Sequence, residues 1–192
     1  MFSDFHAYIQ KNTRLNEGQI QLMLSTAVKR TLRKNEVLLH QGEICRHKAF
    51  VARGLLRGYR VTEDGTEHLI WFSSRYWWTL EPDSYHNQTP SDYIIDALEE
   101  CDVILWTKDA FDELLARIPE LKTFSDQLVS RNLSITRERV FQSLSATAEE
   151  KYDAFVKSHP EIFARVPLHM VASYLGVSRK TITRIRRAQL GR

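Results

Sequence analysis

The chain has 192 residues, of which 43% are hydrophobic and 27% are charged, a balance typical of a protein with a packed core and not of a disordered one. It contains no run of the ~20 apolar residues that a membrane-spanning helix needs, and residues 1–10 lack the apolar stretch of a secretion signal. The net charge of +3 conceals an asymmetry: seven basic and no acidic residues occur from Arg165 onward, leaving 20 basic against 24 acidic residues elsewhere, and such a positive tail is typical of nucleic-acid binding.

The first 118 residues change from a helical to a strand-like pattern. Residues 1–27 predict helix, with Asn16 as an N-cap ahead of an apolar run. Short apolar runs separated by turns follow at 36–40, 49–52, 55–62, 67–72, 93–98 and 103–106. Asp64-Gly65 lies between two of these runs and indicates a hairpin, because glycine accepts a positive φ at little cost. The pattern predicts an antiparallel barrel or sandwich.

From Asp109 the apolar residues follow a helical period. Pro119 can open a new helix, and a long helical stretch then continues to about residue 144. One of its faces carries Val129, Leu133, Val140 and Leu144, and another carries Leu121, Phe124, Leu128 and Ile135. Two apolar faces require two packing partners. We expect these to be the chain's own barrel and the same helix of a second subunit, with the face of Leu121 as the dimer interface; a helix sunk in one large core is the alternative.

The last segment opens with a capping box at 147–150 and contains a helix-turn-helix pattern that begins at Leu168. Ala172 stands where the two helices approach each other, Gly176 supplies the positive φ of the turn, and Ser178 can cap the second helix. The small shared core is filled by Leu175, Val177, Ile182 and Ile185.

The second helix of this motif presents an exposed polar face consisting of Arg179, Lys180, Thr183, Arg184 and Arg187. Residues near the N-terminus of a recognition helix reach base edges, and later ones meet phosphates. An arginine can bridge O6 and N7 of guanine, which contributes ~1–3 kcal/mol of discrimination per good pair. The sequence therefore predicts binding to double-stranded DNA. A solvated basic helix, a membrane-surface patch and an unrelated helical hairpin remain as alternatives.

The order of strand-rich barrel, long helix and terminal helix-turn-helix resembles the Crp/Fnr transcriptional regulators over nearly the whole chain. Residues 178–185, Ser-Arg-Lys-Thr-Ile-Thr-Arg-Ile, resemble the family's recognition helix, commonly Ser-Arg-Glu-Thr-x-x-Arg. The resemblance implies an α+β fold. Residues 1–118 would form helices and an antiparallel β-roll of the cyclic nucleotide-binding type (a double-stranded β-helix), 119–145 a dimerisation helix, and 146–192 an all-α DNA-binding domain. It also implies a cytoplasmic homodimer on a palindromic operator.

By this resemblance Arg179 and Arg184 read bases, and His169 contacts a phosphate. The chain departs from the family's pattern at two points. Lys180 replaces a frequent glutamate, which exchanges an acceptor for cytosine N4 for a cationic donor, so the family's usual half-site is not expected. The sequence stops at Arg192, and we therefore expect no β-wing after the recognition helix.

Relatives that bind cyclic nucleotides resemble one another in a phosphate-binding cassette with a Gly-Glu-Leu-like turn and an Arg-Ser pair. Here Leu80-Glu81 lacks the glycine, and Ser91-Asp92 stands where Arg-Ser would be. A phosphate that faces Glu81 and Asp92 without an arginine is disfavoured, so we expect that cyclic AMP does not bind in the family's manner. The candidate pocket for another, unknown effector consists of Trp71, Trp78, Leu80, Glu81, Ser91, Asp92 and Tyr93.

Aromatic residues are frequent around this candidate pocket: Trp71, Phe72, Tyr76, Trp77, Trp78, Tyr85 and Trp106. They could hold a small apolar or aromatic ligand. The alternative is that they fill a hydrophobic core, as most such residues do.

Metal sites, cofactors and enzymatic chemistry find little support in the sequence. His40, Cys45 and His47 lack the fourth partner of a zinc site. Cys45 and Cys101 are too few for a disulfide scaffold or an iron–sulfur cluster, so we expect a reducing cytoplasm and no cofactor. Glu99-Glu100 are neighbours on a turn and do not point at one substrate, and no catalytic motif is present, so we expect no enzyme. The competing function is a module that binds a cyclic nucleotide or another small molecule, and whose helix-turn-helix contacts protein instead of DNA.

Overall fold

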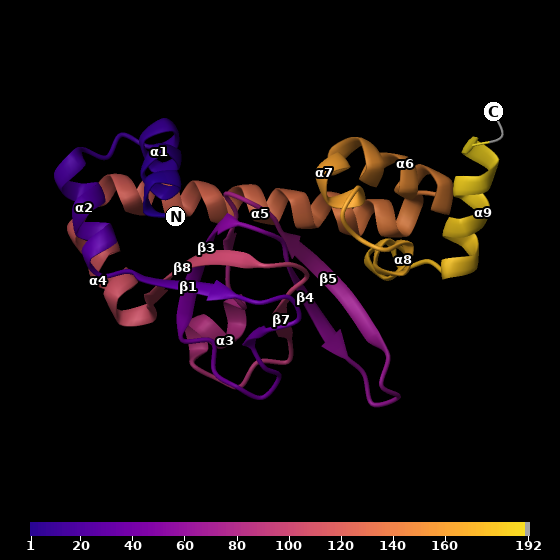
Figure 1. Ribbon diagram of the computed structural model, residues 1–192, viewed down its shortest axis with the longest axis horizontal. Coiled ribbons are helices and arrows are strands. Elements are labelled where there is room, and N and C mark those ends of the chain that lie inside the picture. Colours follow the sequence, from indigo (N-terminus) through magenta and orange to yellow (C-terminus); the bar gives the residue numbers. More distant parts are fainter. Residues whose placement is uncertain (191–192) are drawn as a thin grey trace.

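The computed structural model describes residues 1–190. Two N-terminal helices, α1 (Phe2–Asn12) and α2 (Glu17–Ser25), precede a β-roll, and the long helix α5 (Pro119–Ser145) extends from these helices past the roll to a group of C-terminal helices (Figure 1). The fold is α+β, as predicted. Among residues 1–190, no helix combines the length and apolar composition that crossing a bilayer requires.

Two four-stranded antiparallel sheets form the β-roll. The first has the order β1-β8-β3-β6, with the bounds Val28–Leu32, Cys101–Thr107, His47–Arg53 and Trp78–Thr79. The second has the order β2-β7-β4-β5, with the bounds Val37–Leu39, Ile94–Ala97, Leu56–Val61 and Glu67–Ser73. Each of the six predicted runs overlaps one of these strands, and the predicted hairpin joins β4 to β5, with Gly65 at a φ of 80°. The strand β1 and the short β6 were not predicted.

The first sheet separates two hydrophobic cores, because successive side chains of a strand point to opposite faces. Val103 and Ile95 lie inside the roll. Phe50, Ile104 and Trp106 point outward and pack with α1, α2, α5 and the intervening helix α4 (Lys108–Arg117). The indole N–H of Trp106 donates a hydrogen bond to a carbonyl of α2 over 2.8 Å. The predicted aromatic zone is therefore divided among three cores, because Phe72 packs in a third one with the C-terminal helices.

The two apolar faces of α5 have different surroundings from those predicted. Leu121 (1% exposed) and Phe124 (8%) are buried in the chain's own helical core, and Leu128 packs against it, so the predicted dimer interface is wrong for these residues. The reason is that α1 and α2 cover this face near the start of α5 (Figure 1). Ile135, the fourth predicted contact, is partly exposed. The other face stays open, with exposures of 49% to 83% for Val129, Leu133, Val140 and Leu144.

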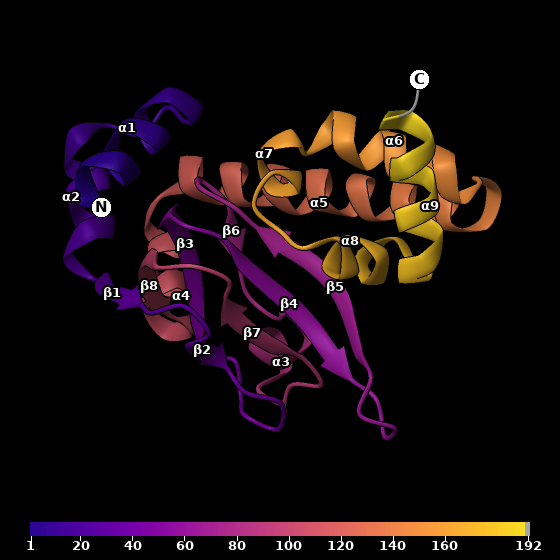
Figure 2. The same ribbon diagram turned by 45° about the vertical axis from the view of Figure 1, so that its right-hand side comes forward.

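The C-terminal helices are α6 (Ala148–Ser158), α7 (Pro160–Phe163), α8 (Leu168–Leu175) and α9 (Arg179–Leu190). The predicted capping box opens α6: the N–H of Glu150 donates to Thr147 Oγ1, and the N–H of Thr147 donates to the Glu150 carboxylate. Their hydrophobic core also contains Leu55, Leu69 and Phe72 from the roll. The C-terminal helices thus pack against the β4–β5 side of the roll, as Figure 2 shows.

Candidate nucleic-acid interface

The turn between α8 and α9 has the geometry that the sequence predicted. Gly176 ends α8 in the left-handed region, with φ 66° and ψ 34°. The N–H of Val177 donates to the carbonyl of Ala172 over 3.0 Å, which closes the turn. A residue with a Cβ would be strained at this φ, so glycine is the residue that this turn requires.

A small core fixes the angle between the two helices. Val171 and Ala172 of α8 and Ile182 and Ile185 of α9 are each no more than 5% exposed, and they pack with Phe155 and other residues of α6 and α7. The predicted core residues Leu175 and Val177 are partly buried in the same cluster. The helix-turn-helix is therefore held by α6 and α7 as well as by its own residues.

Ser178 caps α9, as predicted. Its Oγ accepts a hydrogen bond from the N–H of Thr181 over 3.1 Å and lies 2.8 Å from Thr181 Oγ1. This cap satisfies one of the N–H groups that the first turn of a helix leaves unpaired. The basic residues that follow are therefore presented from a well-defined helix start.

The exposed face of α9 is cationic and forms a hollow of about 400 Å³. It is lined by Arg179, Lys180, Thr183, Arg184 and Arg187. The four basic side chains are exposed, and within residues 1–190 no carboxylate forms an ion pair with any of them. Thr183 is half-buried and donates its hydroxyl to the carbonyl of Arg179 over 2.9 Å. The structure thus brings together the five predicted residues of this helix.

The position of α9 leaves this face accessible. In Figure 1, α9 lies at the end of the molecule opposite α1 and α2, beyond the end of α5 and away from the β-roll. His169, the predicted phosphate contact, is exposed in the first turn of α8. Arg192, the last residue of the predicted basic tail, lies outside the described residues.

The first helix of the motif is docked on the edge strand β5, which sequence reasoning missed. Ser173 Oγ accepts a hydrogen bond from the N–H of Leu69 (3.0 Å) and donates one to the carbonyl of Glu67 (3.1 Å). The guanidinium of Arg139 in α5 lies 4.1 Å from the ring centre of Tyr174 and donates to the carbonyl of Ile70 over 2.6 Å. No sequence signal links these segments, because about 70 to 106 residues separate the partners.

The β-roll does not bring the predicted ligand-pocket residues into one site. Trp78 points out of the roll into the helical core, where its ring packs against Phe5 and Trp106. Trp71 points into the roll, and its indole N–H donates to Thr79 Oγ1 over 3.3 Å. A Cβ on Gly58 would lie 2.1 Å from the Trp71 ring, so this indole rests directly on the backbone of β4. Trp71 therefore fills this part of the roll.

The polar members of the predicted pocket are bound to the chain itself. Glu81 caps the helix α3 (Pro82–Asn87), and its carboxylate accepts the N–H of Ser84 over 2.7 Å. Ser91 exchanges hydrogen bonds with the backbone of Tyr93, whose ring lies beside Trp71. Asp92 is exposed and forms an ion pair with an arginine of β4 over 3.2 Å. The roll encloses a cavity of about 440 Å³, and of the seven predicted residues only Leu80 lines it.

Metal ligands are not gathered in the part of the chain that the structure describes. Within residues 1–190 no group of three or more His, Cys, Asp and Glu side chains is placed to hold a metal ion. Cys45 and Cys101 are buried free thiols, and burial raises the pKa of Cys101 to about 11.

Known proteins share this domain and this fold. Residues 29–118 match the family described as cyclic nucleotide-binding domain. The structure of FixK2 from Bradyrhizobium japonicum is similar with a TM-score of 0.73 and 16% identity, over 86% of this chain and 84% of that one. The c-di-GMP responsive global regulator CLP of Xanthomonas campestris has a TM-score of 0.73 and 13% identity, over 92% of each chain.

A Eubacterium rectale protein assigned to the Crp/Fnr transcriptional regulators has a TM-score of 0.72 and 17% identity, over 96% of this chain and 88% of that one. No curated protein sequence matches the chain significantly. Residues 29–118 therefore match the cyclic nucleotide-binding domain family, and the chain shares its fold with these solved regulators.

Proposed function

We propose that the protein is a cytoplasmic transcriptional regulator, not an enzyme, that binds specific sequences of double-stranded DNA through α9. The observation that carries this proposal is the exposed cationic face of a helix that a correctly formed turn and core hold in place. Basic side chains without carboxylate partners keep their charge available for phosphates, and α-helices fit the major groove. The fold shared with Crp/Fnr regulators supports the same function.

Within this proposal the residues of the motif have different roles. Arg179 and Arg184 lie in the first half of α9, where side chains of a recognition helix reach base edges. Lys180 offers a cationic donor beside them, while Arg187 and His169 flank the groove and contact phosphates. Ser178 and Thr183 make hydrogen bonds to the helix itself and keep its first turns ordered.

We further propose that a second copy of the chain covers the open face of α5. Val129, Leu133, Val140 and Leu144 recur at intervals of four and seven residues and so lie along one side of the helix. Contact between water and an apolar stripe of this kind is unfavourable, and burying the stripe against a second helix lowers the free energy. A two-fold axis at α5 would place two copies of α9 on a palindromic operator, with half-sites about one helical turn apart.

Salt dependence of DNA binding tests the proposed function. A dimer with at least about six phosphate contacts is expected to lose roughly a thousandfold in affinity for its operator between 50 and 200 mM salt. Fluorescence anisotropy with a labelled duplex measures this slope. If the protein binds no duplex at low salt, its helix-turn-helix serves another purpose, such as contact with a protein.

Cyclic nucleotides are expected not to bind this β-roll. Trp71 occupies space inside the roll, Glu81 is buried and caps α3, and Asp92 engages an arginine of β4. A cyclic phosphate held in the manner of the cyclic nucleotide-binding relatives would be buried beside these two acidic side chains, which is unfavourable. Calorimetry with cyclic AMP and cyclic GMP is therefore expected to show no saturable heat. Micromolar binding of either nucleotide would contradict this account of the cassette.

A further inference from the structure

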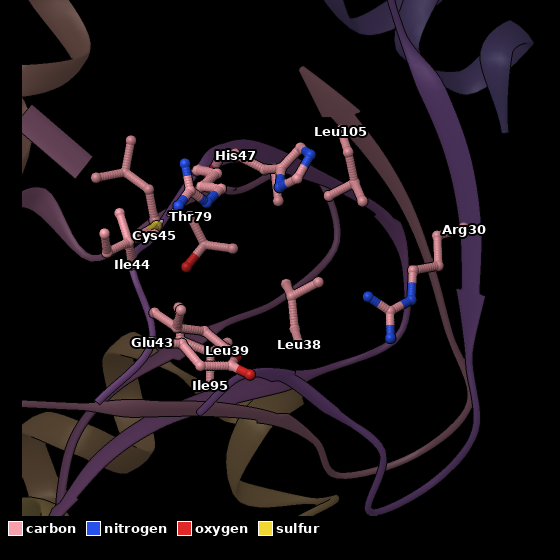
Figure 3. A pocket seen from close by; sticks show the side chains of 13 residues that line it. Arg30, Leu38, Leu39, Glu43, Ile44, Cys45, His47, Thr79, Ile95 and Leu105 are labelled. Atoms are coloured by element: carbon pink, nitrogen blue, oxygen red, sulfur yellow. Dashed lines mark hydrogen bonds between the residues drawn. The ribbon is translucent and has the colours of Figure 1, made fainter. Parts of the chain in front are cut away.

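A cavity of about 440 Å³ lies between the two sheets of the β-roll (Figure 3). Its walls come from strands of both sheets and from the segment that precedes β3. The apolar part of its lining is formed by Leu38, Leu39, Ile44, Cys45, Ala49, Leu80, Ile95 and Leu105. The volume suits a small organic molecule.

Two basic side chains lie on the inner face of the first sheet, where apolar residues are expected. Arg30 of β1 pairs with Val103 of β8, and paired residues of neighbouring strands share a face. His47 precedes Ala49 of β3 by two residues and therefore lies on the same face as Ala49. Figure 3 shows both side chains turned toward the space that Leu38 also faces.

Three basic side chains, Arg30, Arg46 and His47, and one acidic side chain, Glu43, line this cavity. Burial, together with the charges of Arg30 and Arg46, lowers the pKa of His47. Within residues 1–190 no carboxylate forms an ion pair with Arg46 or His47. Glu36 binds Arg30 over 2.9 Å, and Glu43 accepts the N–H of His40 over 3.1 Å. An anion that entered here would gain Arg46 as a cationic partner and would favour protonation of the His47 ring.

We propose that this cavity binds a small monocarboxylate with an apolar tail. The carboxylate would lie at Arg30, Arg46 and His47, and the tail would lie among the leucines of the lining. Glu36 already offsets part of the charge of Arg30, and Glu43 also lines the cavity, so one negative charge is better accommodated than the two of a phosphate ester. This inference does not rest on DNA binding.

Calorimetry with octanoate tests the proposal. Octanoate is expected to bind the full-length protein saturably at one site per chain. Octanol keeps the tail without the charge, and acetate keeps the charge without the tail, so both are expected to bind at least about tenfold more weakly. In a parallel NMR titration, octanoate is expected to raise the pKa of His47, because an anion favours the protonated ring.

Substitutions distinguish the cavity from a non-specific surface. Arg30→Gln is expected to weaken octanoate binding about tenfold, since one charge-assisted hydrogen bond is lost, while Arg30→Lys keeps most of the affinity. Arg33→Gln removes the same charge from an exposed position outside the cavity and is expected to change nothing. Equal effects of Arg30→Gln and Arg33→Gln, or octanoate binding no tighter than octanol, would overturn the proposal. Arg30 would then serve only as an inward-pointing charge that prevents the edge strand β1 from pairing with strands of other molecules.

Discussion

The variant Arg184→Ala is expected to bind the operator at least tenfold more weakly than the wild-type protein and to lose its preference at one base pair of each half-site. Arg184 is exposed in the hollow of α9, so its removal leaves the core of the motif intact. A bidentate contact between arginine and guanine contributes about 1–3 kcal/mol of discrimination, and a dimer has two of them. Gel-shift titrations with the operator and with single-base variants measure both effects.

Arg186→Ala is the matched control for this experiment. Arg186 lies on the same helix and is exposed, but it does not line the hollow. Its removal changes the net charge by the same amount and is expected to cost much less affinity, with sequence preference unchanged. If Arg184→Ala and Arg186→Ala behave alike, α9 attracts DNA only by its charge and does not read bases.

The second large effect is expected from Leu133→Glu, which should convert the proposed dimer into monomers. Leu133 is 49% exposed in the single chain, near the middle of the open face of α5. A carboxylate buried at that position in both copies costs several kcal/mol, which corresponds to a rise of at least a hundredfold in the dimer dissociation constant. Sedimentation velocity measures the change, and operator affinity is expected to fall with it.

The control variant Gln127→Glu adds the same charge to α5 but on a different face of the helix. By the helical period Gln127 lies away from the stripe that Leu133 belongs to, and it is exposed. This variant is expected to remain dimeric. A Leu133→Glu protein that sediments as wild type, or a Gln127→Glu protein that dissociates equally, would show that copies do not meet at this face.

The helix-turn-helix could be predicted from sequence because its determinants are local. Gly176 provides the positive φ that the turn needs, and Ser178 caps α9 through the N–H of a residue three positions later. Both features depend only on residues that are close in sequence. All strands of the roll except β1 and β6 were also predicted, because alternation and turns are properties of neighbouring residues. The cavity was not predicted, since it depends on Arg30 and His47 lying on an inner face that only strand pairing defines.

The predictions of the ligand pocket and of the dimer interface each required a decision about the direction in which a side chain points. The sequence does not show whether a strand residue lies inside or outside the roll, or which apolar face of α5 packs within the chain. Trp71 and Trp78 lie in different cores because β5 and β6 turn them to different sides of the roll. On α5 both faces are apolar, and only the positions of α1 and α2 decide that Leu121 and Phe124 are buried within the chain. Contacts between segments that are distant in sequence thus determine which of these side chains are buried, and local sequence patterns do not show those contacts.

The most direct test of sequence-specific recognition is a selection of DNA sequences that the wild-type protein retains from a random duplex pool. The proposal predicts enrichment of a two-fold-symmetric sequence whose half-sites lie about one helical turn apart, and loss of that enrichment with Arg184→Ala. Retention of all duplexes alike, with no enriched sequence, would contradict the assignment of α9 as a recognition helix.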